Sequence, residues 1–188
     1  MKDNLRSLFL TKRKQIDTSF KILLDDKIYN NFIKSEFYKN TDRILLYSST
    51  KCEVCTEKIF KKAIADHKTV AFPLCDTENL TMDFYSIKSE KELFLSHYNI
   101  LAPKLNPENL IIPNQNDVII VPAILYNLQG FRIGYGKGYY DRYLTSHKIK
   151  SVGIIYEDYI LDSTFNTLFD KNVNTIISEE REITIDKL

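Results

Sequence analysis

Glycine is scarce in this sequence, and so are several other features that would narrow its function. Among 188 residues there are five glycines, three cysteines and no tryptophan. No apolar run approaches the roughly 20 residues that cross a bilayer, and the charged N-terminus lacks the apolar core of a secretory signal. We therefore expect neither a membrane partner nor a secretory leader. Because three cysteines cannot all pair within the chain, the sequence favours a reducing, cytoplasmic setting.

The charge balance argues against a further class of partner. The formal net charge is +1, so we expect no general electrostatic attraction to nucleic acid. The apolar content of 44% is typical of a globular protein, and 188 residues can bury one substantial core. The sequence therefore predicts a single domain over residues 1–188.

Short apolar runs alternate with segments of helical periodicity along the chain. The strongest strand signal is 117–122, and apolar residues recur at helical spacing over 2–38, where Asp17-Thr18-Ser19 predicts a break between two helices. The alternation predicts an α/β fold, a single-domain three-layer sandwich with a largely parallel, Rossmann-like sheet flanked by helices. Further strands are expected at 43–49, 69–74, 81–86, 151–156 and 174–178, further helices at 54–67, at 89–96 and from 138 onward, and an irregular connection at 97–116.

Four of the five glycines fall in one stretch, Gly130-Phe-Arg-Ile-Gly-Tyr-Gly-Lys-Gly-Tyr-Tyr-Asp-Arg142. Backbone N–H groups in such a loop can converge on an anion, and the basic side chains add positive charge. The stretch is not a P-loop, because Phe131 and Gly138 break that pattern, and Tyr139 breaks the dinucleotide-binding fingerprint. We interpret it as a phosphate-handling loop. A tight turn with aromatic packing is the alternative, although a turn does not need four glycines.

Three other features are weaker on their own. Lys2 and Arg6 lie at i and i+4 on one helix face, where such pairs are usually solvated. Glu53 follows the strand at 43–49, where open α/β sheets bind ligands, although helix capping is the more common role of such a glutamate. Cys52 and Cys55 have no second ligand pair for zinc, so we favour coincidence. The histidines are scattered, and nothing predicts a covalent mechanism.

The glycine-rich stretch, preceded by Val121-Pro122, resembles the signature of the 5-formyltetrahydrofolate cyclo-ligases, also called 5,10-methenyltetrahydrofolate synthetases. Supporting similarities span most of the chain. Lys2-x-x-Leu5-Arg6 resembles the N-terminal basic motif of that family, and Glu53-Val-Cys-Thr56 resembles its Glu-Val-Asp-Thr segment. Three residues depart from the family's pattern, which has an acidic residue, glutamate and aspartate at the positions of Cys55, Ala102 and Asn127, respectively.

The resemblance implies an ATP- and Mg²⁺-dependent ligase of folate and one-carbon metabolism. 5-Formyltetrahydrofolate, with or without a polyglutamate tail, would be cyclised to 5,10-methenyltetrahydrofolate, with release of ADP and phosphate through a phosphorylated formyl (iminium phosphate) intermediate. Such phosphoryl transfer needs positioning and charge neutralisation more than a covalent nucleophile. We expect the protein to be cytoplasmic, as the cysteine count already suggests, and to be a monomer.

The positions that match the family's motifs take their roles from the resemblance. Arg132, Lys137 and Tyr139 are the expected catalytic residues, and Asp141 and Asp170 are the expected Mg²⁺ ligands. The expected ATP-binding residues are Lys2, Asp3, Asn4, Leu5, Arg6, Arg132, Ile133, Gly134, Tyr135, Gly136, Lys137, Gly138, Tyr139 and Tyr140. The expected folate-binding residues are Ser48, Glu53, Tyr135, Gly136, Lys137, Gly138 and Tyr139.

Other classes of function remain as alternatives. A non-catalytic folate- or nucleotide-binding protein could keep the same scaffold, but storage of folate alone would not require Lys2, Arg6, Arg132, Lys137 and Asp141 together. Another α/β enzyme, acting on phosphorylated sugars or coenzyme A thioesters, is compatible with the architecture alone. A nucleic-acid-binding module is the least favoured, given the charge balance.

Overall fold

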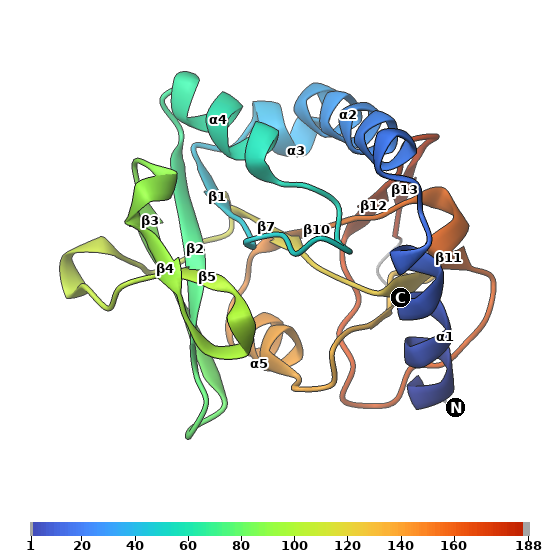
Figure 1. Ribbon diagram of the computed structural model, residues 1–188. Helices are drawn as coiled ribbons and strands as arrows, with labels where there is room; N and C mark the ends of the chain where they lie inside the picture. Colours follow the sequence, from blue (N-terminus) through green and yellow to red (C-terminus); the bar gives the residue numbers. More distant parts are fainter. Residues whose placement is uncertain (1, 186–188) are drawn as a thin grey trace.

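A computed structural model describes residues 2–185 and shows an eight-stranded sheet with helices on both faces (Figure 1). The strand order is β13-β12-β10-β7-β1-β2-β3-β6. Met1 and residues 186–188 of the expected domain lie outside the described residues. The strands of this sheet are β1 (Arg43–Leu45), β2 (Thr69–Asp76), β3 (Thr81–Ile87), β6 (Leu110–Ile111), β7 (Val118–Val121), β10 (Lys150–Ile154), β12 (Thr175–Ile177) and β13 (Glu182–Thr184).

The centre of the sheet is parallel and its edges are antiparallel. β2, β1, β7, β10 and β12 run parallel to one another, whereas β3, β6 and β13 pair antiparallel with their neighbours. The expectation of a largely parallel sheet is confirmed for the centre, and the sheet as a whole is mixed. The segment 81–86 is a strand as expected, but a short turn after β2 folds it back into a hairpin, so it runs antiparallel.

The helices cover the two faces of the sheet, which confirms the three-layer prediction. α2 (Thr18–Lys34), α3 (Glu36–Lys39) and α4 (Glu57–Ala65) lie on one face, and α5 (Tyr139–Ser146) lies on the other (Figure 1). α1 (Lys2–Lys14) precedes α2, and the expected break is confirmed. The Asp17 side chain accepts hydrogen bonds from the backbone N–H groups of Ser19 and Phe20, and so caps α2.

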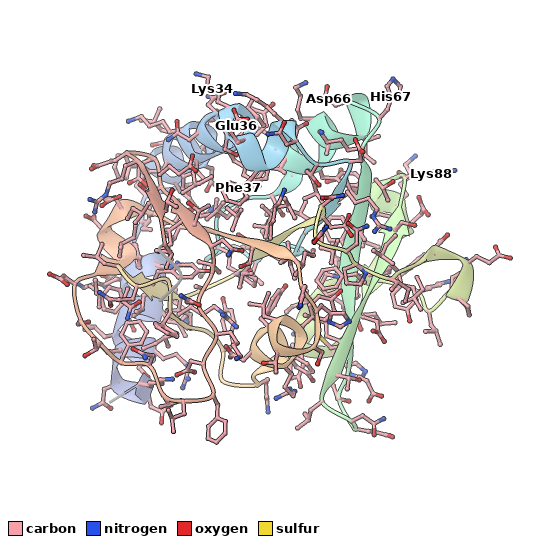
Figure 2. All side chains as sticks on the ribbon, turned by 180° about the vertical axis from the view of Figure 1, so that it is seen from behind. Lys34, Glu36, Phe37, Asp66, His67 and Lys88 are labelled. Carbon is pink, nitrogen blue, oxygen red and sulfur yellow. The ribbon has the colours of Figure 1, made fainter. Side chains whose placement is uncertain are left out.

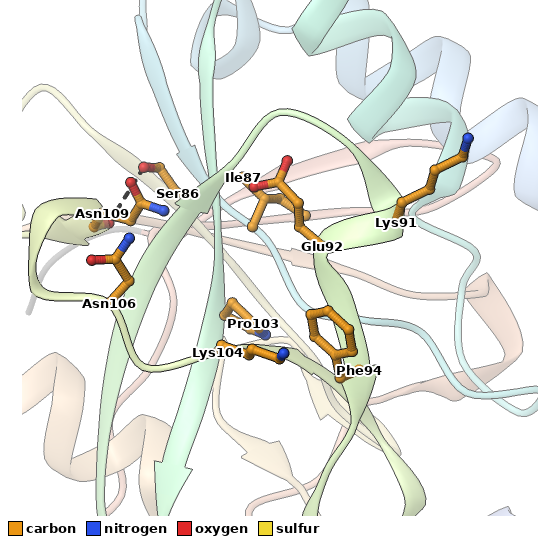
Figure 3. Close-up of a pocket in the computed structure, with 9 residues that line it drawn as sticks. All are labelled: Ser86, Ile87, Lys91, Glu92, Phe94, Pro103, Lys104, Asn106 and Asn109. Carbon is orange, nitrogen blue, oxygen red and sulfur yellow. Dashed lines mark hydrogen bonds between the residues drawn. The ribbon is translucent and has the colours of Figure 1, made fainter.

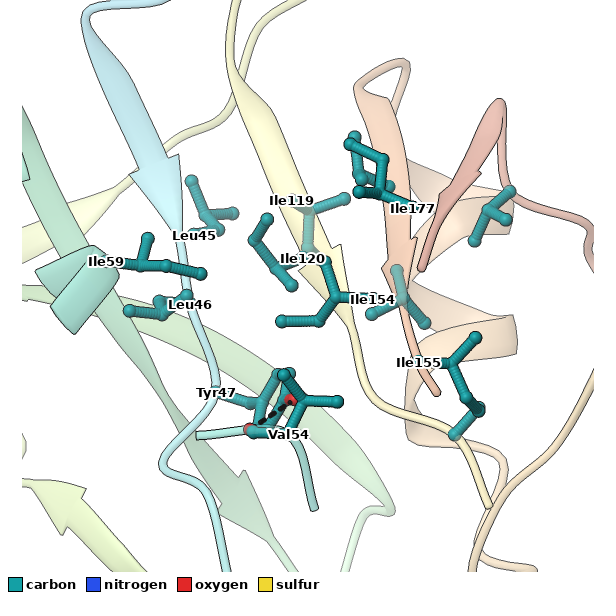
Figure 4. Close-up of a cluster of buried hydrophobic side chains, with 14 of the residues drawn as sticks. Leu45, Leu46, Tyr47, Val54, Ile59, Ile119, Ile120, Ile154, Ile155 and Ile177 are labelled. Atoms are coloured by element: carbon teal, nitrogen blue, oxygen red, sulfur yellow. Dashed lines mark hydrogen bonds between the residues drawn. The ribbon is translucent and has the colours of Figure 1, made fainter. Parts of the chain in front are cut away.

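The parallel strands form the core of the molecule. Their apolar runs are buried because helices cover both faces of the central strands. Ile44, Leu45, Ile119 and Ile120 are all 0% exposed, and so is Ile59 of α4. Figure 4 shows Leu45, Ile119 and Ile120 of these strands together with Ile59 of α4. This packing fixes the positions of the loops that leave β1 and β7.

The expected helix at 89–96 is wrong. A 3₁₀ turn at Glu90–Glu92 leads directly into β4 (Leu93–Leu95), which pairs antiparallel with β5 (Leu101–Pro103). Ser89 and Glu92 do form a reciprocal capping box, but only one turn follows it. Two consecutive left-handed residues, Tyr98 (φ 61°) and Asn99 (φ 57°), then reverse the chain into β5.

The connection over 97–116 is therefore more ordered than expected. Besides β5 and β6 it contains 3₁₀ turns at His97–Asn99 and Pro107–Asn109. A second small sheet, with the order β11-β8-β9, lies beyond β7. It consists of β8 (Leu125–Asn127), β9 (Arg132–Ile133) and β11 (Ile160–Leu161), with a 3₁₀ turn at Glu157–Tyr159 before β11.

The layer formed by α2, α3 and α4 has polar side chains at the end away from the β11-β8-β9 sheet. Figure 2 shows, from behind, Glu36 of α3 and, at the end of α4, Asp66 and His67. His67 has a φ of 60° and turns the chain toward β2. Among residues 2–185, no helix is both long enough and apolar enough to cross a membrane.

Gly153 of β10 provides a test of the packing. A Cβ at this position would lie 2.5 Å from Cζ of Tyr126, whose ring is fully buried. We expect Gly153→Ala to destabilise the fold by about 1–3 kcal/mol through overpacking, measured by urea unfolding.

Gly134→Ala is the matched control for this substitution. A Cβ at Gly134 would meet nothing within 4 Å, so we expect a change within about 0.5 kcal/mol. Equal unfolding midpoints for the two variants would contradict the contact between Tyr126 and Gly153.

Candidate functional site

The candidate site lies where the order of the parallel strands reverses. From β1 the chain crosses to β2 on one side, and from β7 it crosses to β10 on the other. The loops that leave β1 and β7 therefore diverge, and in open α/β sheets ligands bind in the crevice between such loops. Here the first loop is 46–56, which follows β1. The connection from β7 to β10 passes through β8 and β9, and residues 134–138 are its segment between β9 and α5.

The glycine-rich loop 134–138 presents backbone donors at the start of α5. Gly136 (φ 91°) and Gly138 (φ 69°) are in the left-handed region, which favours glycine. Gly138 is the N-cap of α5, and no side chain of the described residues caps this end. The N–H groups of the first turn of α5 are therefore available to an anion, which the helix dipole also favours.

Arg6 of α1 lies across this loop. Its Nε donates to the carbonyl oxygen of Gly134 at 2.8 Å, and its guanidinium also pairs with Asp3. A Cβ at Gly136 would lie 3.3 Å from Nη2 of Arg6, so the glycine allows this close approach. The structure thus brings together two segments of the expected ATP site that are far apart in the sequence.

Lys2 lies on the same face of α1 as Arg6 and contacts the C-terminal part of the chain. Its Nζ lies 2.5 Å from Oδ2 of Asp170. Thr167 also donates to this carboxylate, through both its backbone N–H and its hydroxyl. Burial alone would raise the pKa of Asp170, but the hydrogen bonds from Lys2 and Thr167 together hold the pKa below its ordinary value.

Arg132 is buried, with 7% of its surface exposed, and it holds Asp141. Its Nη2 donates to Oδ1 of Asp141 at 2.9 Å, and its Nη1 donates to the carbonyl oxygen of Lys171 at 2.8 Å. The backbone N–H of Lys171 donates to the same Oδ1 at 3.0 Å. Because Lys171 directly follows Asp170, this contact brings the two expected Mg²⁺ ligands to one place.

The two carboxylates suit a magnesium ion. Within residues 2–185, the hydrogen bonds to the Asp141 carboxylate all go to Oδ1, and those to the Asp170 carboxylate all go to Oδ2. Oδ2 of Asp141 and Oδ1 of Asp170 are therefore left for a cation. The described part of the chain has no cluster of three or more metal-binding side chains. Mg²⁺ is commonly held by one or two carboxylates, with substrate phosphates and water completing its shell, so two are sufficient.

Glu53 lies on the opposite wall, in the loop after β1. It is 5% exposed, and its Oε2 accepts a hydrogen bond from the backbone N–H of Thr50 at 2.8 Å. α4 begins only at Glu57, so helix capping, which we considered the more common role of Glu53, is wrong. The carboxylate instead closes the turn of its own loop.

Tyr135 approaches Glu53 from the glycine-rich loop. Half of its surface (49%) is exposed, but its hydroxyl end lies against the loop of Thr50 and Glu53. Burial of that end, followed by the charge of Glu53, raises the pKa of Tyr135 to about 12. The glycine-rich loop is therefore near enough to the loop after β1 for the charge of Glu53 to act on Tyr135, and the Tyr135 hydroxyl keeps its proton at neutral pH.

Tyr98, at the tip of the β4–β5 hairpin, is a site residue that the sequence analysis missed. Its hydroxyl lies 3.5 Å from the hydroxyl of Tyr139. This hydrogen bond, followed by burial, raises the pKa of Tyr139 to about 12. The only signal in the sequence is the length of the connection at 97–116, because long connections in compact domains are often functional, but length does not indicate which residue reaches the site.

The remaining expected residues differ in exposure. Lys137 is exposed, and its backbone carbonyl accepts a hydrogen bond from Nη2 of Arg142 at 2.7 Å. Ser48 is half-buried in the loop after β1. Asn4 is exposed, whereas Leu5, Ile133 and Tyr140 pack against or within the hydrophobic core.

Two cavities of the molecule lie outside this set of residues. One, of about 240 Å³, lies between β3 and the base of the β4–β5 hairpin and is lined by Phe94, Lys104 and Asn109 among others (Figure 3). The other, of about 610 Å³, lies between the α1–α2 junction and Tyr159. Neither contains an expected site residue.

Comparison with known proteins identifies the family. A family model described as the 5-formyltetrahydrofolate cyclo-ligase family matches residues 1–179. The chain belongs to this family. The expectation of a cyclo-ligase enzyme is thereby confirmed at the level of the family.

Individual cyclo-ligases are similar over nearly the whole chain. A 5-formyltetrahydrofolate cyclo-ligase of Mycoplasma genitalium is 32% identical over 180 residues, which cover 94% of this chain and 96% of the relative. A 5,10-methenyltetrahydrofolate synthetase structure from Mycoplasma pneumoniae has a TM-score of 0.74 at 26% identity, covering 95% of this chain and 98% of that one. A synthetase structure from Aquifex aeolicus, at 24% identity and a TM-score of 0.79, covers 100% and 94% of the two chains and shows the same fold.

In this cyclo-ligase family member, the Lys2–Asp170 ion pair predicts how the stability of the fold depends on pH. The folded carboxyl has a lowered pKa, so the pair stabilises the fold above the ordinary pKa of an aspartate, and this contribution is lost as the pH falls through the folded value. We expect Lys2→Met to raise the Asp170 pKa toward its ordinary value, measured by ¹³C NMR titration of the carboxyl. Lys14→Met, at the exposed end of α1, is the control. An unchanged Asp170 titration in Lys2→Met would contradict the pair.

Proposed function

We propose that this protein catalyses the ATP- and Mg²⁺-dependent cyclisation of 5-formyltetrahydrofolate to 5,10-methenyltetrahydrofolate, with release of ADP and phosphate. The observation that carries the proposal is the convergence of four distant segments on one site. α1 provides Lys2 and Arg6, the glycine-rich loop leads into Asp141, and the segment before β12 provides Asp170. The loop after β1 provides Glu53, whose charge acts on Tyr135 of the glycine-rich loop. We further propose that the chain acts as a single-domain monomer in the cytoplasm.

The triphosphate would lie over the glycine-rich loop. The N–H groups at the start of α5 would bind phosphate oxygens, and Arg6 and Lys137 would add positive charge from either side. Asp141 and Asp170 would hold Mg²⁺, which supplies charge that neutralises the phosphates. Support for this arrangement comes from Lys2, whose ammonium already compensates the charge of Asp170 and could turn to a phosphate instead.

Arg132 would act through Asp141 rather than directly on a phosphate. Its guanidinium is buried, and two of its nitrogens are already engaged by Asp141 and by the carbonyl of Lys171. A direct phosphate contact would require it to leave the carboxylate. Arg132 therefore fits the role of a positioning residue that fixes the Asp141 side chain, rather than the catalytic, ATP-binding role expected for it.

The folate would lie between the loop after β1 and the β4–β5 hairpin. Buried carboxylates accept hydrogen bonds strongly, so Glu53 would bind the amino and N–H groups of the pterin, beside Ser48. Tyr135, Tyr139 and Tyr98 would border the formyl group and the adjoining ring, and the raised pKa values of Tyr135 and Tyr139 would keep the hydroxyls of these two residues protonated. The formyl oxygen would then face the glycine-rich loop and the γ-phosphate.

The chemistry needs two steps. A formamide carbonyl is a poor electrophile, so the γ-phosphoryl group of ATP is first transferred to the formyl oxygen, which releases ADP. N10 of the folate then attacks the activated carbon, a C–N bond forms, and the C–O bond breaks with loss of phosphate and of the N10 proton. Both steps depend on holding the formyl group in line with the γ-phosphate and beside N10.

The reaction can be tested directly. Purified protein mixed with 5-formyltetrahydrofolate, ATP and Mg²⁺ should produce the near-ultraviolet absorbance of the methenyl product, and omission of ATP should abolish it. A folded protein that binds folate and ATP but forms no product would instead favour the alternative, a non-catalytic binding protein.

Asp141→Asn tests the role of the metal ligand. The amide keeps the shape of the side chain but loses the charge, so we expect the KM for Mg·ATP to rise by at least about tenfold, while folate binding measured by calorimetry stays within a factor of about two. Asp162→Asn, in an exposed connection, is the matched control. Unchanged kinetics in Asp141→Asn would remove Asp141 from the metal site.

A further inference from the structure

Arg13, near the end of α1, is a buried cation to which the proposed reaction gives no role. It is 4% exposed, and its Nη1 donates to the carbonyl oxygen of Cys52 at 3.0 Å. Cys52 directly precedes Glu53, the residue proposed to bind the pterin. The guanidinium therefore contacts the backbone of the loop that carries this carboxylate.

Two aromatic rings hold the guanidinium in place. Its central carbon lies 4.8 Å from the ring centre of Tyr159 and 5.9 Å from that of Tyr156. Tyr156 also donates from its hydroxyl to Asp25 at 2.7 Å, and its hydroxyl lies 3.5 Å from the carbonyl oxygen of Glu53. Arg13 thus holds the loop at the carbonyl of Cys52, and the Tyr156 hydroxyl, whose proton goes to Asp25, lies beside the next carbonyl, that of Glu53.

The environment of Arg13 is unfavourable for stability alone. Its Nε and Nη2 are buried without a hydrogen-bond partner among the described residues. Leaving such donors unpaired costs free energy, which stacking on Tyr156 and Tyr159 offsets only in part. An unbranched apolar side chain such as methionine could fill the same space without this cost. A buried arginine here is better explained by the loop that it holds.

α1 carries contacts to both proposed subsites. Lys2 and Arg6 lie on the ATP side, where they contact Asp170 and Gly134. Arg13 is eleven positions from Lys2, about three turns of an α-helix, and so lies on nearly the same face. Phe9, between Arg6 and Arg13, is 5% exposed and fixes this face against the core.

We infer that Arg13 is a positioning residue for folate: it holds the loop at 50–53 so that Glu53 faces the pterin, and it makes α1 the common support of the two subsites. This inference rests on the proposed function. Because the loop contacts the folate before and during the reaction alike, loss of Arg13 should weaken folate binding without slowing the chemical steps.

Arg13→Met is the test, with Lys14→Met as the control that removes the neighbouring charge of the same helix. We expect Arg13→Met to keep or raise the melting temperature and to raise the folate KM by about tenfold, with kcat and the KM for ATP within about twofold of the wild type. Lys14→Met should leave all four quantities unchanged. Arg13→Lys, which keeps the charge but loses the planar guanidinium, should also raise the folate KM.

The outcomes separate this inference from the proposed function. A wild-type protein that forms no methenyl product contradicts the function itself. An active wild type with an unchanged folate KM in Arg13→Met or Arg13→Lys overturns the positioning role alone. A lower melting temperature with kcat and both KM values unchanged overturns it too, because a purely structural arginine would give that result.

Discussion

The carboxylate of Asp141 is the junction on which the candidate site depends. Its Oδ1 accepts hydrogen bonds from Arg132 in β9 and from the backbone of Lys171 before β12, while Asp141 itself lies in the first turn of α5. Three segments are thereby fixed to one atom. The contact with Lys171 also fixes the position of Asp170, which directly precedes Lys171 in the sequence. Asp170 in turn accepts a hydrogen bond from Lys2 and so holds α1 at the site. Without this junction, the two proposed metal ligands, Asp141 and Asp170, and the N-terminal helix would not be held together.

The sheet determines where this junction can form. Burial of β1 and β7 on both faces requires helices on both sides, and the chain leaves these two strands in opposite directions. The divergence places loops at this edge of the sheet, and loops can carry glycines and charged side chains that the core could not accommodate. Glu53 lies in the loop after β1, and the glycine-rich loop at 134–138 lies in the connection after β7. The fold therefore supplies the location, and the loops supply the chemistry.

Local patterns in the sequence predicted the parts of the fold that depend on local physics. The apolar run at 117–122 predicts β7, Asp17 predicts the start of α2, and the clustered glycines predict the loop at the start of α5. Features that depend on contacts distant in sequence were missed or wrong. The β4–β5 hairpin forms because Leu93–Leu95 finds a partner strand, which outweighs the helical signal of the capping box at Ser89. The spacing of residues in the sequence did not predict the ion pair between Arg132 and Asp141 or the hydrogen bond from Arg13 to the loop at Cys52 either. Each of these contacts joins segments that only the fold brings together.

The distribution of charge explains how such a site stays stable without its substrates. Among the described residues, Lys2 is paired with Asp170, Arg132 with Asp141, and Arg6 with Asp3 and the carbonyl of Gly134. Lys137 is exposed, where water solvates its charge at little cost. Binding of a triphosphate with its metal would then exchange partners rather than bring together unpaired like charges: Lys2 and Arg6 would turn from carboxylates to phosphates, and the metal would bind the free oxygens of Asp141 and Asp170. Such an exchange needs little reorganisation of the backbone, because the Lys171 amide and the Arg132 guanidinium continue to hold Asp141 throughout.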